Sequence, residues 1–175
     1  MTLLKNDGIL PLARKISNVA VIGPWFDATT QMQGYYQGTA PYLVSPFTAF
    51  KSAWSNVVQS VGTGISSTST SDFSAALEAA KNADYIIYCG GIDTSVEAEG
   101  KDRGSISWPG NQLDLISQLA ALKKRLIVVQ FGGGQVDDSP LLSNPGVDAI
   151  VWAGYPGQEG GNALKDVLTA EFPIA

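Results

Sequence analysis

The sequence predicts an α/β fold: a mostly parallel, doubly wound sheet of about five to six strands with helices on both faces, an α/β sandwich. Strand-like and helix-like patterns alternate along the chain, which favours parallel strands joined by right-handed crossovers. Several strand-like runs are apolar throughout, as is typical of strands buried on both faces. The 175 residues suffice for one full-sized core, so we expect a single domain over residues 1–175.

Five short segments rich in Val, Ile and Tyr predict the strands. They are residues 18–22, 56–61, 85–89, 125–131 and 148–152. Residues 62–71 are rich in Gly, Ser and Thr, and we expect them to form an ordinary long loop between a strand and a helix.

Four segments with apolar residues at helical spacing predict the helices. The first begins with Ser45 as its cap and Pro46 in its first turn. The four apolar stripes are Phe47, Phe50 and Trp54; Phe73, Ala76, Leu77 and Ala80; Leu115, Ile116, Leu119 and Leu122; and Leu164, Val167 and Leu168. Because Trp54 and Trp152 lie inside predicted elements, we expect both in the core.

The composition excludes several classes of chemistry. The formal charge of −5 argues against nucleic-acid binding, which needs clustered positive charge. Histidine is absent, which removes histidine-based nucleophile activation and most zinc sites. Cys89 is the single cysteine, and its apolar surroundings favour a buried side chain. We therefore expect no metal and no cofactor, and any proton transfer would fall to carboxylates.

Other partners and ligands are also disfavoured by sequence patterns. No apolar stretch approaches the ~20 residues of a membrane helix, so we expect no membrane partner. Neither G-x-G-x-x-G after the first strand nor G-x-x-x-x-G-K-[ST] occurs, so phosphate binding is poorly supported.

Glycine-rich, acid-bearing loops follow four of the predicted strands, at residues 23–25, 90–93, 132–137 and 154–161. In a parallel sheet these loops meet at the carboxyl edge of the strands, where ligands bind. We therefore expect Trp25, Glu99, Gly134 and Tyr155 at one end of the molecule, with the 93–103 loop projecting furthest.

The 93–103 loop holds the densest group of charges, with four carboxylates and two cations. Opposed electrostatic environments of this kind can keep one carboxyl protonated as a general acid. The alternative is a solvated loop that neutralises its own charges.

Aromatic side chains form the second functional feature of the predicted loops. They are Trp25, Tyr35, Tyr36, Tyr42, Trp108 and Tyr155. An aromatic face beside carboxylates and amides suits a sugar ring, which has apolar C–H faces and many hydroxyls. For each aromatic taken singly, the alternative is packing over a loop.

Taken together, these loops resemble the second, α/β domain of glycoside hydrolase family 3, and most closely its fungal β-xylosidase branch. The similarity spans essentially the whole chain. Its segments are Leu3 to Gly8, Leu10 to Leu12, Ala20 to Pro24, Gly38 to Tyr42, Gly90 to Asp93, Glu97 to Glu99, Asp102-Arg103, Trp108 to Ile116, Gly132 to Asp137, and Gly154 to Gln158.

The resemblance implies a retaining, exo-acting β-xylosidase or related β-glycosidase that uses two carboxyl groups ~5–5.5 Å apart. In this family the nucleophilic aspartate lies on a preceding (β/α)8 barrel, and the α/β domain supplies the acid/base glutamate. The stretch Glu99-Gly100-Lys101-Asp102-Arg103 resembles the family's Glu-Gly-x-Asp-Arg motif, so Glu99 is the acid/base candidate and Glu97 the second candidate.

The remaining site expectations follow from the same resemblance. Trp25, Tyr35, Asp93, Arg103 and Tyr155 are the candidate sugar-binding residues. The implied partners are a β-linked xylo-oligosaccharide or other glycoside and the barrel domain of the same enzyme, without which the chain would be inactive.

The ends of the chain depart from the family pattern. Residues 1–15 correspond to part of an interdomain connection, and the family continues beyond residues 171–175 into a further strand, so we expect truncation at the C-terminal edge. The parent enzyme is expected to be secreted, with its signal upstream. The alternative function is a doubly wound module that binds a small carbohydrate ligand at its loop edge without chemistry.

Overall fold

The computed structural model describes residues 1–13 and 15–170. One six-stranded sheet has the order β1-β6-β5-β4-β2-β3. Its strands are β1 (Thr2–Asn6), β2 (Val19–Ile22), β3 (Val57–Ser60), β4 (Tyr85–Gly91), β5 (Arg125–Phe131) and β6 (Ala149–Gly154). The helices are η1 (Thr30–Gln33, 3-10), α1 (Pro46–Ala53), α2 (Phe73–Lys81), α3 (Gln112–Ala121), α4 (Ser139–Leu142) and α5 (Gly160–Leu168).

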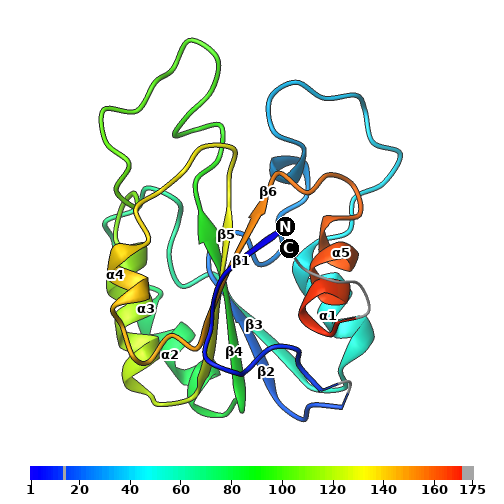
Figure 1. The fold of residues 1–175 in the computed structure, drawn as a ribbon, viewed down its shortest axis with the longest axis vertical. Coiled ribbons are helices and arrows are strands. Elements are labelled where there is room, and N and C mark those ends of the chain that lie inside the picture. Colours follow the sequence, from blue (N-terminus) through cyan, green and yellow to red (C-terminus); the bar gives the residue numbers. More distant parts are fainter. Residues whose placement is uncertain (14, 171–175) are drawn as a thin grey trace.

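The predicted α/β fold is confirmed. Strands β2 to β6 pair in parallel and correspond to the five predicted segments, with ends that differ by at most two residues. The sheet stands between two helical layers, with α1 and α5 on one face and α2, α3 and α4 on the other (Figure 1).

Strand β1 was not predicted, because residues 1–15 were interpreted as part of an interdomain connection and show no clear strand pattern. It pairs antiparallel with β6 and forms one edge of the sheet. An edge strand is half solvated, and its alternating exposed and half-buried residues leave only a weak pattern. The truncation expected at the C-terminal edge concerns residues 171–175 and the strand that follows in the family, and it lies outside the described residues.

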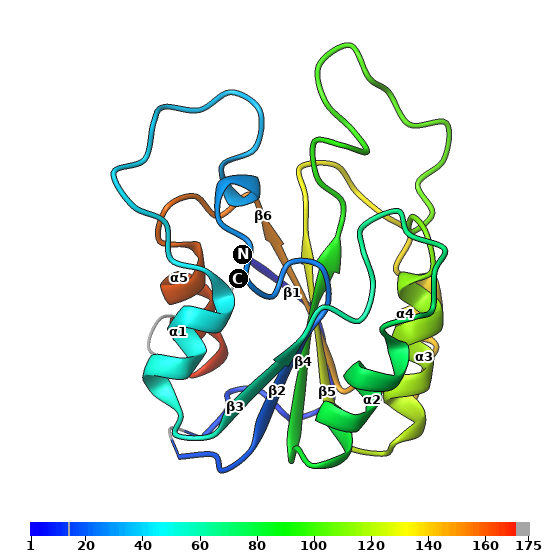
Figure 2. The same cartoon turned by 180° about the vertical axis from the view of Figure 1, so that it is seen from behind.

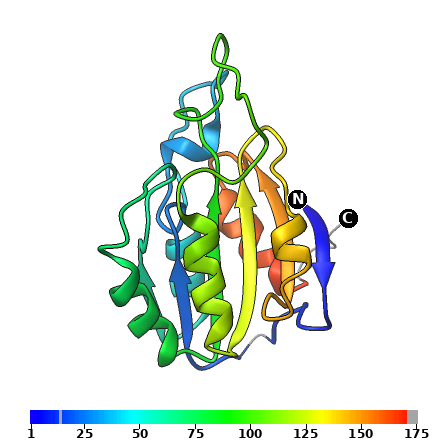
Figure 3. The ribbon, with the colours of Figure 1, turned by 90° about the vertical axis from the view of Figure 1, so that its left-hand side faces the viewer.

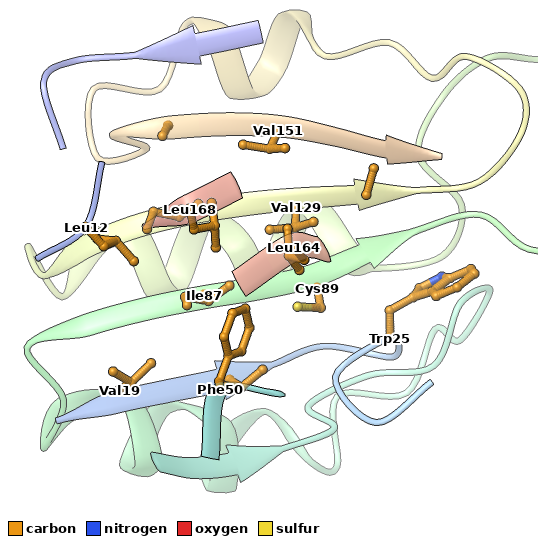
Figure 4. Packing of buried hydrophobic residues seen from close by; sticks show 14 of the residues in the cluster. Leu12, Val19, Trp25, Phe50, Ile87, Cys89, Val129, Val151, Leu164 and Leu168 are labelled. Carbon is orange, nitrogen blue, oxygen red and sulfur yellow. The ribbon is translucent and has the colours of Figure 1, made fainter. Parts of the chain in front are cut away.

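One apolar core fills the space between the sheet and helices α1 and α5. Figure 4 shows Phe50, Leu164 and Leu168 from these helices packed over Cys89 and Val129 of the sheet. Cys89 is fully buried as expected, and burial raises the pKa of its thiol far above its usual range. The thiol is thus a packing group.

A second core fills the opposite face, under α2, α3 and α4 (Figure 3). Among the predicted core tryptophans, Trp54 is confirmed at 3% exposed. The expectation for Trp152 is wrong, because its side chain is only half-buried. Trp152 lies on β6, on the face of the sheet that α4 covers. Because α4 has only four residues, it leaves a hollow beside Trp152 that Leu4 and Asp138 also line.

The loops at the carboxyl edges of the parallel strands gather at one end of the molecule, as predicted. Two of them, the connection from η1 to α1 and the connection from β4 to α3, extend beyond the sheet (Figure 2). The β4–α3 connection reaches furthest (Figure 3). Helix α1 begins at the predicted cap, since Ser45 Oγ accepts from the Thr48 amide at 3.1 Å.

Candidate functional site

Close backbone contact between neighbouring strand ends builds the base of the site. Gly91 ends β4 with φ +118°, and a Cβ there would lie 2.2 Å from the Phe131 carbonyl oxygen. Only glycine fits this position without moving the backbone. Buried Gln112 holds the same glycine, accepting from its amide at 2.9 Å and donating to its carbonyl at 2.8 Å. The start of the 93–103 loop is therefore fixed to β5 and α3.

Three aromatic rings, one from the end of β5 and two from the loops after β2 and β6, pack together beneath the site. Trp25, which follows β2, lies parallel to Phe131 with ring centroids 4.7 Å apart. Tyr155, which follows β6, meets Trp25 at 6.2 Å and a tilt of 42°. Trp25 is only 1% exposed, so it supports Tyr155 from the core and presents no ring face to solvent. Tyr155 is half-buried and is the upper member of this stack.

The half-buried phenol of Tyr155 lies in the field of the charged loop. Burial raises its pKa above the usual value, and the charges of Asp93 and Glu97 add to the rise, while Arg103 and a hydrogen bond with the Gly133 backbone oppose it. The structure therefore brings Tyr155, Asp93, Glu97 and Arg103 together, although they come from two separate loops.

Arg103 forms the central ion pair of the site. Its Nε donates to Glu97 at 2.5 Å, and a terminal nitrogen donates to the Gln135 carbonyl at 2.7 Å. The other terminal nitrogen is buried without a hydrogen-bond partner among the described residues. Gly134 lies directly against the pair, since a Cβ there would come within 2.2 Å of a Glu97 oxygen. This ion pair ties the 93–103 loop to the loop after β5.

Glu99 lies at the exposed tip of the same loop. Ala98 and Lys101 form an isolated antiparallel bridge in which the Lys101 amide donates to the Ala98 carbonyl at 2.9 Å. Gly100 supplies the left-handed position of this turn with φ +71°. Glu99 in this turn is exposed, and the hydroxyl of Tyr36 donates to its carboxylate. The two predicted glutamates therefore occupy different environments.

The remaining predicted site residues lie around this centre. The Asp93 carboxylate accepts from the Ser95 amide at 2.9 Å, so one of its oxygens caps the loop. Tyr35 is 55% exposed on the neighbouring η1–α1 connection and contacts Tyr36 edge to face. Trp25 is the exception, because it lies in the core below.

Two residues of the site had no assigned role from the sequence. Tyr36 was noted among the loop aromatics, but its contact with Glu99 joins residues 63 positions apart, and no local pattern indicates it. Gln112 lies at the start of a predicted helical segment, and no role was assigned to it. The one sequence signal for such a role is its polar side chain beside the apolar stripe, directly after the loop of residues 108–111.

One surface hollow lies far from this chemistry. Its volume is about 680 Å³, and it is lined by Lys123, Lys124 and Arg125 at the opposite edge of the sheet. A second hollow of about 480 Å³ lies behind Gly133 and Gln135, between Trp152 and Asp138. Burial raises the pKa of the Asp138 carboxyl, although the Trp108 indole donates to it at 3.2 Å.

Within residues 1–13 and 15–170, no helix is long and apolar enough to cross a membrane. In the same residues, no three His, Cys, Asp or Glu side chains are grouped so that they could hold a metal ion.

The sequence matches a known family over nearly its whole length. Residues 1–173 match the family described as "Glycosyl hydrolase family 3 C-terminal domain". "Probable exo-1,4-beta-xylosidase xlnD" of Aspergillus fumigatus is 57% identical over 171 residues, or 98% of this chain. "Probable exo-1,4-beta-xylosidase bxlB" of Aspergillus terreus is 60% identical over 169 residues, or 97% of this chain.

Two solved structures are also similar to the chain over nearly its whole length. The chain matches "GH3 exo-beta-xylosidase (XlnD) in complex with xylobiose aziridine activity based probe" with a TM-score of 0.94 and 56% identity over 97% of its length. It matches the GH3 β-glucosidase of Bifidobacterium adolescentis with a TM-score of 0.81 and 31% identity over 97% of its length. The chain spans only 22% of the A. fumigatus and A. terreus relatives and 22% and 25% of the two solved chains.

Proposed function

The chain belongs to glycosyl hydrolase family 3, as its C-terminal domain, and from this membership we propose that it supplies the general acid/base of a retaining exo-β-xylosidase. Glu99 carries this role. The partner nucleophile and the rest of the sugar site belong to the barrel of the same enzyme, and the substrate is a β-linked xylo-oligosaccharide.

The different surroundings of Glu99 and Glu97 carry the proposal. A general acid/base must reach the glycosidic oxygen and must exchange a proton in each half-reaction. Glu99 is exposed on the β4–α3 connection, which reaches furthest beyond the sheet (Figure 3), so a substrate held by another domain could meet it. Glu97 lies below, bound to Arg103, and would have to give up this ion pair to become protonated.

Tyr155, Tyr35, Asp93 and Arg103 form the sugar-facing part that we propose for this domain. Tyr155 and Tyr35 offer aromatic rings, and Asp93 retains a second carboxylate oxygen beyond the one that caps the loop. The unpartnered terminal nitrogen of Arg103 is a donor that a bound sugar could satisfy. Trp25 acts indirectly, by supporting Tyr155.

The test compares Glu99→Ala and Glu97→Gln in the full-length enzyme. Glu99→Ala is expected to slow turnover by ~10²–10⁴-fold on xylobiose, whose leaving group needs protonation. An aryl xyloside with a good leaving group should lose less in the first step, so hydrolysis of the covalent intermediate becomes limiting. Azide needs no general base and should restore turnover, releasing a β-xylosyl azide.

Glu97→Gln is the matched control, because it changes a carboxylate two residues away. Without the charge that Arg103 binds, this variant should weaken substrate binding or stability, but azide should not accelerate it. Rescue of a Glu97 variant without rescue of Glu99→Ala would exchange the two roles. Absence of rescue in both would place the acid/base outside this loop.

A further inference from the structure

Tyr36 and Glu99 join the two loops that extend beyond the sheet. The Tyr36 hydroxyl donates to the Glu99 carboxylate across 63 residues of sequence. We propose that Tyr36 is a positioning residue that holds the Glu99 carboxylate in place for proton transfer. The inference rests on the proposed acid/base role of Glu99 and adds a second residue to it.

Packing does not account for the position of Tyr36. Its side chain is 78% exposed, more than any other large hydrophobic side chain of the described residues. Its ring contact is the edge-to-face pair with Tyr35, which is itself 55% exposed. An exposed ring of this size gains little from burial. The hydrogen bond to Glu99 is thus the contact by which Tyr36 can act on the site.

The segment that carries Tyr36 is fixed close to its base. Buried Met32 anchors η1 in the core, and its carbonyl accepts from the Gly157 amide at 2.8 Å. The Gln33 side chain donates to the Gly38 carbonyl at 3.1 Å and closes the short loop between them. Gly34 lies against Tyr155, since a Cβ there would meet its ring at 2.9 Å. Tyr36 therefore projects from a braced turn.

The far end of the same connection is fixed as well. The Tyr42 hydroxyl donates to Glu159 at 2.5 Å, and the Val44 amide donates to the Gln158 carbonyl at 2.9 Å. Both contacts are made to the start of α5. A residue held between these anchors can serve as a fixed reference for a side chain on another loop.

The Glu99 carboxylate needs a contact from another loop to fix its position, because its side chain is exposed on its own loop. The turn fixes the Glu99 backbone through the bridge of Ala98 with Lys101, but the carboxylate is exposed. A proton donor that lies about 1 Å from its productive position can lose roughly 10²-fold in rate. Tyr36 limits the positions that the carboxylate can occupy, and its O–H can rotate away when Glu99 is protonated.

The test is a double-mutant cycle in the full-length enzyme, with Tyr36→Phe, Glu99→Ala and the double variant. Tyr36→Phe is expected to lower kcat/KM on xylobiose about 5- to 20-fold, mainly through kcat, and to have a smaller effect on a 2,4-dinitrophenyl xyloside, which needs less proton donation. In the Glu99→Ala background, Tyr36→Phe should change the rate less than about 2-fold, because the group that it positions is absent.

Thr39→Val is the matched control, since it removes an exposed hydroxyl from the same connection and leaves the Tyr42–Glu159 and Tyr36–Glu99 contacts in place. Its effect on kcat should stay below about 2-fold and should be the same for both leaving groups. If Tyr36→Phe lowers activity equally in the Glu99→Ala background, Tyr36 acts on the sugar instead and the inference is overturned. If Glu99→Ala alone leaves xylobiose turnover intact, the proposed function itself fails.

Discussion

The carboxylates of Glu97 and Glu99 differ in what holds them. Glu97 is bound by Arg103 and pressed against Gly134, so it joins two loops into one surface. Glu99 is exposed and forms no ion pair within residues 1–13 and 15–170, and its carboxylate accepts from the Tyr36 hydroxyl. The more buried pair is therefore suited to shaping the site, and the exposed carboxylate to meeting a substrate.

Gly134→Ala tests the importance of the Glu97–Arg103 pair. The added Cβ would lie 2.2 Å from a Glu97 oxygen and 2.6 Å from an Arg103 terminal nitrogen, so the pair must move. We expect a loss of about 1–3 kcal/mol in the free energy of unfolding, as for other overpacked sites. Chemical denaturation of the isolated chain measures this loss.

Gly104→Ala is the control for Gly134→Ala, because no atom lies within 4 Å of a Cβ at that position. It should leave the unfolding free energy within about 0.5 kcal/mol of the original. Equal stability of the two variants would show that the Glu97–Arg103 pair accommodates the added methyl group and is not tightly fixed.

At the scale of elements, side-chain hydrogen bonds join neighbouring loops at the carboxyl edge of the sheet. The Tyr42–Glu159 bond ties the η1–α1 connection to α5, and Arg103 ties the β4–α3 connection to the loop after β5. Trp108 and Asp138 add a second tie between the last two. Loops that extend far beyond the sheet thereby keep a defined shape.

The Tyr42–Glu159 tie should depend on pH. Hydrogen bonds from Tyr42 and then Asn162 lower the pKa of the Glu159 carboxyl below its usual value of 4.5. A carboxyl with a lowered pKa stabilises the fold when ionised, and this stability is lost as the pH falls through the folded pKa. Tyr42→Phe should therefore lower the thermal midpoint at pH 7, and the difference from the original chain should shrink toward pH 3. A difference that stays constant over this range would contradict the account.

The sequence predicted those elements whose signals are local. Short segments rich in Val, Ile and Tyr, several of them apolar throughout, predicted β2 to β6, and the Ser45-Pro46 pair predicted the start of α1. Strand β1 was missed because an edge strand buries only part of one face. Trp152 was wrongly assigned to the core, because its exposure depends on how little of the sheet α4 covers.

The candidate site could be predicted only in part, for a related reason. Glycine-rich loops after parallel strands indicated the correct edge and the correct charged loop. Which glutamate is bound by Arg103 depends on the bend at Gly100 and on the close approach of Gly134, and neither is set by local spacing. The placement of Tyr36 beside Glu99 and of Trp25 below Tyr155 likewise follows from the tertiary arrangement.

On the scale of the whole molecule, we propose that this domain supplies one of the two carboxyl groups that a retaining glycosidase needs. The chain spans about a fifth of the length of its curated relatives. A retaining mechanism requires a nucleophile ~5–5.5 Å from the acid/base, which we assign to the barrel. We therefore propose that the domain completes a site that the barrel shares, and that it is inactive alone.

Turnover by the purified 175-residue chain tests this half-site account most directly. Circular dichroism and a cooperative thermal transition first establish that the chain is folded. Release of nitrophenol from an aryl β-xyloside is then followed beside the full-length enzyme. We predict a rate no higher than that of buffer for the chain, because we assign the nucleophile that forms the covalent intermediate to the barrel. Robust turnover that is abolished by Glu99→Ala would show that this chain contains a complete active site and would contradict the account.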